Sequence, residues 1–468
     1  MAINWKQYPP AGHEQRVKDY GRYEQLFLSG HKQAFKVKTG GAFQLTRYII
    51  SNFLAGLSTL SADMLFGEQP DFMVDDEANK AAGEAVSGIV ERNDLLTMGY
   101  EAALAASFRG ETVLKVRWGL RTPDYADPEA VIEEVPPGIW FPDLSEDNVR
   151  DVRTVSLAWL KIDPSDAKRQ YLRIEEHEPG LIRNRLLLLS AEGEDPQEVE
   201  LSTLEEYADL EPEVETGLAA IPIIHIPNYR YGSRYFGISD YQGLEALQEA
   251  INSRISMVDN VLDKHVAPKL AVPPSMFNED GVIDRNKLEL IPLEKGETIP
   301  TYITWDASLQ AAFAQFDKLQ ELLFMLSETC PTIFGLEKFG VAQSGSALRL
   351  RMQRTISKIN RKRLYFNTGL IEALWLAQQL ETIHGGATYE PCPVTISWAD
   401  GLPEDVKEMV EIESQRMAAG NTSVESSIRR LDGPGGVEAE MDRIAAEEGQ
   451  SSVLTGRGPE PPASGAQE

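Results

Sequence analysis

Seven basic side chains and no acidic one lie between positions 349 and 363. Arg354, Lys358 and Arg361 follow one another at spacings of four and three, which places them on one face of a helix. Such a face binds nucleic-acid phosphates, or pairs with carboxylates of its own chain or of neighbouring subunits. We favour pairing with carboxylates, because the chain carries a formal charge of −28. The basic residues are Arg349, Arg351, Arg354, Lys358, Arg361, Lys362 and Arg363.

The sequence contains none of the common motifs that signal catalysis. It has no GxxxxGK(S/T) phosphate-binding loop, no HExxH metal motif and no GxSxG nucleophile turn. Its six histidines are scattered, and each is better explained as a core or surface residue. The nearest candidate for a metal-dependent nuclease site is Asp71 with the acids 75–77 and Lys80, but their spacing does not fit a PD-(D/E)xK signature. We therefore expect no enzymatic activity, no catalytic residue, no metal site and no cofactor.

Composition indicates an acidic, water-soluble protein. The chain has 468 residues, 42% of them hydrophobic, which is enough for two to four domains. Cys330 and Cys392 are the only cysteines, which favours a reducing compartment. No apolar run reaches 18 residues, so no membrane-spanning helix is expected. The acidic excess argues against general adhesion to DNA, yet it suits a DNA partner that slides past, because basic contacts to phosphate are what make binding tight.

The apolar pattern and its breakers predict a mixed α+β chain. The predicted helices span residues 42–66, 76–108 (broken near Asn93 and Asp94), 239–266, 308–329 and 346–384, with two or three small acidic ones between 404 and 448. The predicted strands span residues 111–118, 171–178, 181–190, 221–227 and 393–398. Residues 190–215 contain eleven acids and no base, which indicates an exposed loop or flap. The segment from 451 onward has the composition of a disordered tail.

A capping box, Ser239 to Gln242, is predicted to open the helix that ends before Pro268. Apolar side chains recur on this helix at intervals of three and four, close to heptad spacing. The pattern predicts one narrow stripe that packs on a neighbouring helix. The stripe consists of Leu244, Leu247, Ile251, Ile255, Val258 and Leu262.

A glycine-rich segment separates the last two long helices. Pro331 ends the first of them, and residues 332–346 contain three glycines and two phenylalanines, which is typical of a loop. Taken alone, the segment is best explained as an ordinary helix connection. Its candidate functional residues are Phe334, Gly335, Leu336, Glu337, Lys338, Phe339 and Gly340.

The order of segments from residue 221 onward resembles the portal proteins of tailed bacteriophages. The resemblance is carried by Pro222-Ile-Ile-His-Ile-Pro-Asn228, by Gly237-Ile-Ser-Asp240 with GLEALQEAINSRIS after it, and by SETCPTIFGLEKFGVAQSGSALRLRM. LFGEQP at 65–70 and GETVLKV at 110–116 look like N-terminal elements of the same family. The ordered set, which covers nearly the whole chain, carries the resemblance.

The resemblance implies a portal-type α+β subunit. Its parts would be an α/β wing, a two-helix stem, a small β-containing clip, a tunnel loop, a long wing helix and a small helical crown. The implied boundaries are 1–237 (wing), 238–266 (first stem helix), 267–305 (clip), 306–330 (second stem helix), 331–345 (tunnel loop), 346–384 (long wing helix), 385–450 (crown) and 451–468 (tail). The tips of the tunnel loop, 334–340, would touch DNA, and the basic helix would form inter-subunit salt bridges or contact DNA.

The resemblance also implies a non-enzymatic role. The expected assembly is a homo-oligomeric ring of twelve subunits at one capsid vertex of the virion, built in the host cytoplasm, through which double-stranded DNA passes in packaging and ejection without sequence recognition. The implied partners are the large terminase, a head–tail adaptor, and the major capsid and scaffolding proteins, with no membrane. The alternatives are a non-portal acidic scaffold or adaptor whose basic helix grips a partner protein and, less favoured, a metal-dependent nuclease.

Overall fold

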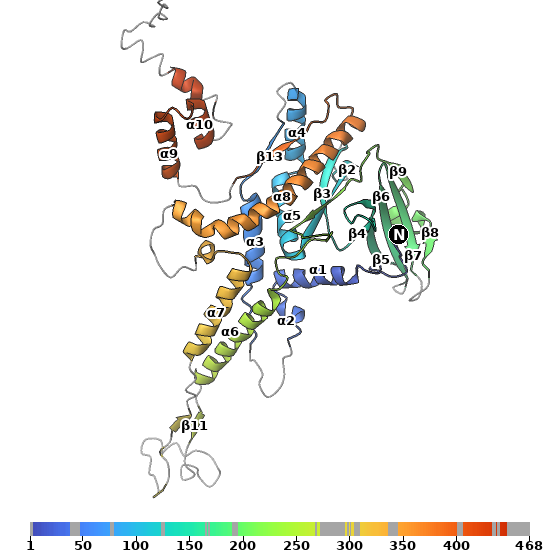
Figure 1. The fold of residues 1–468 in the computed structure, drawn as a ribbon. Helices are drawn as coiled ribbons and strands as arrows, with labels where there is room; N and C mark the ends of the chain where they lie inside the picture. The colour runs from blue at the N-terminus through green and yellow to red at the C-terminus, as the bar shows by residue number, and fades with distance from the viewer. Residues whose placement is uncertain are drawn as a thin grey trace, which may run out of the picture. The chain divides into compact units, whose positions relative to one another are not determined.

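The computed structural model has a mixed α+β architecture (Figure 1), as predicted. By its internal packing the chain divides into two units, residues 1–337 with 352–401 and residues 338–351 with 402–468. The residues that the structure describes are 3–37, 47–74, 79–122, 127–163, 166, 169–189, 195–266, 269–271, 295–296, 299, 301–303, 309–335, 345–399, 406–432, 437 and 440–446.

Three helices lead the chain: α1 (Glu14–Phe27), α2 (His31–Ala34) and α3 (Phe53–Phe66). Helix α3 begins at Phe53 because the side-chain oxygen of Asn52 caps it, accepting a hydrogen bond from the Ala55 amide at 3.1 Å. The prediction of a helix over 42–66 is therefore wrong for residues 47–52, which are not helical, and residues 42–46 lie outside the described residues.

The next two helices, α4 (Lys80–Arg92) and α5 (Leu95–Arg109), confirm the predicted break. Asp94 has a φ of 43° and caps α5 with its side chain. The Asn93 side chain leaves the helix axis and accepts a hydrogen bond from the Ile132 amide at 2.8 Å, which joins the break to a strand. A residue with positive φ followed by a new cap explains why one helix becomes two.

Two antiparallel sheets follow. The first contains, in order, β10 (Ile223–Pro227), β2 (Glu111–Gly119) and β3 (Glu129–Val135). The second contains, in order, β4 (Trp140–Leu144), β5 (Val152–Ile162), β6 (Gln170–Glu178), β7 (Leu181–Leu188) and β8 (Gln197–Val199), and β9 (Glu213–Glu215) also pairs with β7. The predicted strands over 111–118 and 221–227 are confirmed. The predicted hairpin is confirmed as β6–β7, whose turn residue Gly180 has a φ of 83°.

The acidic stretch after β7 is more ordered than its charge pattern predicts. Residues 190–194 lie outside the described residues, but 195–215 form β8, β9 and two short 3₁₀ helices, Leu201–Thr203 and Glu205–Tyr207. Leu201 and Leu204 are buried against Tyr171 and Leu186. Most of the stretch is exposed, as predicted, but it is not a loop throughout, because these two leucines anchor it to the sheet.

Helices α6 (Glu245–Val266) and α7 (Leu309–Leu326) pack side by side (Figure 1). The predicted start of α6 at Ser239 is wrong, because residues 239–244 form a turn in which Ser239 and Asp240 are buried and Gly243 has a φ of 87°. Beyond α6, a two-stranded sheet pairs β11 (Lys269–Ala271) with β12 (Thr301–Ile303). Most of the segment between these strands lies outside the described residues.

Helix α8 (Gly345–Ile383) confirms the predicted long helix. It packs closely on β10 at Gly369, where a side-chain Cβ would lie 2.4 Å from Cγ1 of Ile226. Real Cβ atoms do not approach neighbours this closely, so only glycine fits at this crossing.

Gly369→Ala is expected to lower the free energy of unfolding by about 1–3 kcal/mol, because Ile226 is fully buried and has no room to move away. Gly83→Ala in α4 is the matched control, since a Cβ there meets nothing within 4 Å. The control is expected to stabilise the protein by up to about 1 kcal/mol through helix propensity. Urea unfolding of both variants checks the opposite signs, and two stabilising substitutions would contradict the close packing of α8 on β10.

The remaining elements confirm the predicted strand near 393–398 and the small acidic helices. Strand β13 (Thr395–Ser397) pairs with β1 (Asp71–Met73). In the second unit, α9 (Val406–Ala418) packs against α10 (Val424–Asp432), and the buried Glu413 accepts a hydrogen bond from Arg430 at 3.0 Å.

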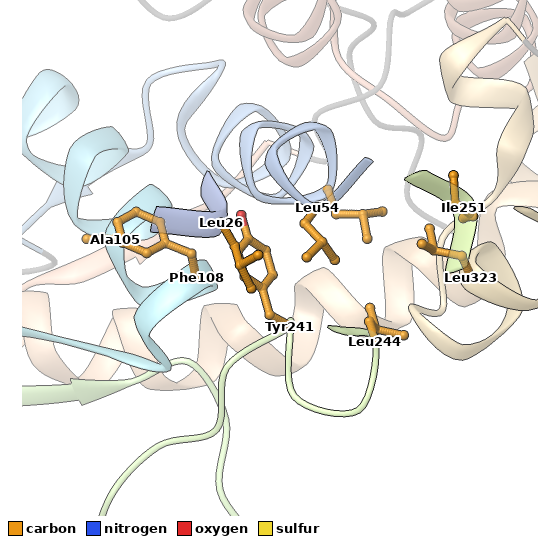
Figure 2. Packing of buried hydrophobic residues seen from close by; sticks show 9 residues of the cluster. Leu26, Leu54, Ala105, Phe108, Tyr241, Leu244, Ile251 and Leu323 are labelled. Atoms are coloured by element: carbon orange, nitrogen blue, oxygen red, sulfur yellow. The ribbon is translucent and has the colours of Figure 1, made fainter. Parts of the chain in front are cut away.

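Side chains from α1, α3, α5, α6 and α7 meet in one apolar cluster (Figure 2). Tyr241, which precedes α6, is fully buried there, and its hydroxyl accepts a hydrogen bond from the Ser58 hydroxyl at 3.0 Å. The cluster therefore attaches the α6–α7 pair to the N-terminal helices. Its buried members are Leu26, Leu54, Leu57, Ala105, Phe108, Tyr241, Leu244, Ile251 and Leu323.

Candidate functional site

The turn before α6 carries a buried carboxylate, that of Asp240, to the point where α3, α5, α7 and α8 converge. The turn is fixed by the Asp240 amide, which donates to the Ser107 carbonyl at 2.9 Å, and by the Ser239 hydroxyl, which donates to the Phe108 carbonyl at 2.6 Å. The Ser239 oxygen also accepts from the Tyr241 amide at 3.0 Å. Ser239 therefore caps a turn, as the capping-box pattern suggested, but the turn directs Asp240 inward and does not start the helix.

Asp240 forms a buried charge cluster with Lys358 and Lys362 of α8. The Lys358 ammonium lies 3.1 Å from Oδ1 and the Lys362 ammonium 2.5 Å from Oδ2. The Ser107 hydroxyl donates to Oδ2 at 2.6 Å, and the Asn228 amide donates to Oδ1 at 3.2 Å. The carboxylate thus accepts three hydrogen bonds and has a second ammonium group in ion-pair contact, which is how a buried charge is accommodated.

Within the cluster, the pKa values of Asp240 and Lys362 are both lowered, for different reasons. Burial alone would raise the pKa of Asp240, but Lys358 and Lys362 hold it well below its usual range. Burial lowers the pKa of Lys362 to about 8 against the attraction of Asp240, and repulsion from Lys358 adds to the decrease. One carboxylate therefore holds two ammonium groups, one of which is destabilised in its charged form.

Glu328, just after α7, joins this helix to the basic face of α8. It has a φ of 58°, a left-handed conformation that costs a non-glycine residue free energy. Its carboxylate accepts from Arg354 at 3.1 Å and also from Arg361, and Lys358 donates to the neighbouring Ser327 carbonyl at 3.1 Å. These contacts offset the strained backbone at the end of α7.

The segment that follows α7 is attached to α8 and α3. The Cys330 amide donates to the Thr355 hydroxyl at 2.8 Å. The ring of Phe334 lies 5.5 Å from that of Phe324, and its edge faces Gly56 of α3. Gly335 has a φ of 68°. The other predicted tip residues, Leu336, Glu337, Lys338, Phe339 and Gly340, lie outside the described residues.

The seven basic residues of the sequence pattern divide by position. Arg354, Lys358, Arg361 and Lys362 pair with acids of the same chain, as described above. Arg363 donates to the Met64 carbonyl at 2.9 Å and lies over the Trp398 ring. Arg349 and Arg351 lie at the exposed start of α8. The basic residues therefore lie in at least three environments: ion pairs within the chain, a contact with a carbonyl and an aromatic ring, and the exposed start of α8.

The predicted apolar stripe on α6 changes character along the helix. Near its start Leu244 and Ile251 are buried, Leu247, Ile255 and Val258 are half-buried, and Leu262 near its end is 44% exposed. Leu244, Leu247, Ile251 and Ile255 pack against α7 and the N-terminal helices.

A second stripe on α6, which the sequence analysis missed, is polar and fully buried. We call Gln248, Asn252 and Ser256 the polar seam; all three have 0% exposure. The seam binds the main chain of 49–53: amides 49, 51 and 53 donate to Ser256, Asn252 and Gln248 at 2.8, 3.0 and 3.1 Å. Residues four apart on a helix thus match residues two apart in an extended segment, and these contacts explain why 47–52 is not helical.

Among the described residues, no group of three or more His, Cys, Asp or Glu side chains is placed to hold a metal ion. Within the same residues, no helix combines the length and apolarity that crossing a bilayer requires. Of the acids weighed as a nuclease site, residues 75–77 lie outside the described residues.

Some solved structures resemble the chain. The neck of an empty gene transfer agent particle computed with C6 symmetry matches with a TM-score of 0.49 and 11% identity, over 89% of this chain and 94% of that one. The virion of a native gene transfer agent particle matches with a TM-score of 0.47 and 11% identity, over 89% and 94%. The neck of a native particle computed with C12 symmetry matches with a TM-score of 0.47 and 11% identity, over 87% and 99%.

No curated protein matches the chain. A family of phage portal proteins, described as SPP1 Gp6-like, matches residues 197–453, more than half of the chain. This stretch includes the turn of Asp240, helices α6 and α7, and α8 with its basic face. The chain belongs to the SPP1 Gp6-like family of phage portal proteins, which are virion components and not enzymes.

Proposed function

We propose that this chain assembles into a ring at one vertex of the phage head and is the conduit for DNA packaging and ejection. The observation that carries the proposal is the family match over 197–453, which spans the helical pair, the segment after it and the long helix. In the proposed subunit, 1–237 is the wing, α6 and α7 are the stem, 267–305 is the clip, and 331–345 is the tunnel loop. Helix α8 is the long wing helix, and 385–450 is the crown.

Exposed apolar side chains on the helical pair support assembly with further copies of the chain. Met257 of α6 is 48% exposed, and Phe313, Met325 and Leu326 of α7 are 51%, 61% and 59% exposed. Apolar surface of this extent on adjacent helices is stabilised when another subunit covers it. We propose a ring of twelve subunits in which the stem helices of neighbours pack together.

The charge of the chain supports passage of DNA without tight binding. The formal charge of −28 means that carboxylates far outnumber basic side chains, and like charge repels the phosphates of a passing duplex. The ring would dock the large terminase during packaging and a head–tail adaptor afterwards. Its wing and crown would contact the major capsid and scaffolding proteins.

Negative-stain electron microscopy of the purified protein tests the proposal. The expected result is ring-shaped particles with a central hole, and class averages give the number of subunits. A protein that stays monomeric at high concentration and is absent from virions would contradict the proposal.

Deletion of residues 335–340 tests the tunnel loop separately. We expect the rings to assemble normally while DNA packaging or retention falls, because the deleted residues would face DNA and not a neighbouring subunit. Particle counts and packaged DNA per head are the measurements, and a six-residue deletion within 451–468 is the control. Loss of the rings on deletion would show that the segment is structural.

A further inference from the structure

A cavity of about 310 Å³ lies beside the buried charge cluster. Residues from the turn before α6, the end of α7 and the middle of α8 line it, so it is formed within one unit of the chain. Its charged lining consists of Lys358, Arg361, Lys362, Asp240 and Glu328. Three cations therefore face two carboxylates, in a chain whose overall charge is strongly negative.

The two ammonium groups have hydrogen-bonding capacity left. An ammonium carries three donors. Lys362 uses two of them, on Asp240 and on the Ser61 hydroxyl at 2.6 Å. Lys358 donates to the Ser327 carbonyl and lies in ion-pair contact with Asp240. Among the described residues, no acceptor is found for the third N–H of either group. Both side chains line the cavity, so an acceptor placed there would complete both.

The rest of the lining suits an anion with several oxygen atoms. Arg361, whose side chain is 52% exposed, adds a planar fork of donors at the rim, and Tyr229 and Gln242 add a hydroxyl and an amide. A water molecule occupies about 30 Å³ in the liquid, so the cavity has room for a tetrahedral oxyanion with part of its hydration shell. A chloride ion would satisfy fewer of these donors.

We propose that this cavity binds a phosphate group, held by Lys358, Lys362 and Arg361. The group could come from free inorganic phosphate or from the backbone of a nucleic acid, because both present the same oxygens. The proposal concerns a single subunit and does not depend on ring formation or on passage of DNA.

Inorganic phosphate is the probe for the test. Binding to the full-length protein is measured by isothermal titration calorimetry, with sodium chloride at equal ionic strength as the reference. Arg361→Gln is the test variant, because its side chain is half-exposed and the buried pair beneath it stays intact. Lys318→Gln on α7 is the matched control, since it removes one positive charge that pairs with Glu321 and does not line the cavity.

We expect saturable binding of one phosphate per chain by the wild type and by Lys318→Gln. Arg361→Gln should bind about tenfold more weakly, the loss of one charge-assisted interaction. Lys358→Met should abolish binding; if it fails to fold, Arg361→Gln still decides. No saturable binding, or equal affinity in wild type and Arg361→Gln, would overturn the proposal.

A labelled short DNA duplex distinguishes the two sources. If phosphate displaces the duplex and Arg361→Gln weakens both ligands alike, the site accepts backbone phosphate. If the duplex does not compete with phosphate, the site takes the free ion. Both outcomes require that phosphate itself binds, so the first titration alone decides the proposal.

Discussion

Asp240→Ala is expected to lower the free energy of unfolding by about 3–5 kcal/mol, since it leaves Lys358 and Lys362 buried without a counter-charge. Burying two like charges together in a low-dielectric region is far more costly than losing a surface ion pair. Denaturant unfolding followed by circular dichroism measures the loss. Glu328→Ala is the comparison, because its arginine partners are at least half-exposed, and it should cost about 1 kcal/mol or less.

The double variant Asp240→Ala with Lys362→Met distinguishes the cost of an unpaired buried charge from the cost of the lost side-chain volume. Removal of one buried ammonium along with the carboxylate should recover part of the lost stability. If Asp240→Ala does not fold, Asp240→Asn, which keeps the size of the side chain, supplies the measurement. Equal losses in Asp240→Ala and Glu328→Ala would refute the importance of the buried charge cluster.

The pH dependence has a definite sign. Because the folded pKa of Asp240 lies below its ordinary value of 3.8, its contribution to stability is present above pH 3.8 and is lost as the pH falls through the folded pKa. In Asp240→Asn this acid-dependent part should be missing.

Asn252→Ala is expected to free the extended segment 47–53 from α6. The substitution removes a hydrogen-bond partner from the Ser51 amide, the Gln248 side chain and the ring of His31, each of which hydrogen-bonds to Asn252. A buried polar group left without a hydrogen-bond partner lowers the free energy of unfolding by about 1–3 kcal/mol. Hydrogen exchange of peptides that cover 47–53 should become much faster, while peptides from the β6–β7 hairpin should change little.

Glu249→Ala, at an exposed position of the same helix, is the control for helix stability. It should leave exchange in 47–53 unchanged. If Asn252→Ala also leaves this exchange unchanged, the polar seam does not hold the segment, and the apolar cluster alone positions it.

Local patterns predicted the long elements well. The α8 boundaries, the break at Asn93 and Asp94, and the β6–β7 hairpin follow from glycine, capping residues and period, all of which act over a few residues. The start of α6 could not be predicted from local patterns. Its capping-box residues are present, but Asp240 is drawn toward two lysines more than a hundred positions away. A capping-box pattern covers only four neighbouring residues, so it cannot account for an electrostatic attraction to side chains so far along the chain.

The candidate site was predictable only in part. The basic run was visible, yet nothing in its spacing distinguishes the buried Lys362 from the half-exposed Arg361 next to it, because burial depends on Ser61 and Asp240. The polar seam left a usable signal: Gln248, Asn252 and Ser256 recur every four residues beside the apolar stripe. A buried polar row at helical period indicates that something other than a hydrophobic face packs there.

The polar seam of α6 forms hydrogen bonds with the main-chain amides of residues 49 and 51 and with the carbonyl of residue 51, so the side chains at 49 and 51 take no part in those hydrogen bonds. Mutations at these two positions can therefore accumulate without weakening the attachment, so long as the helix keeps its three polar residues. Selection therefore acts on the three polar side chains of α6 and leaves the side chains at 49 and 51 free to vary. Related chains can keep this architecture while their N-terminal sequences lose recognisable similarity.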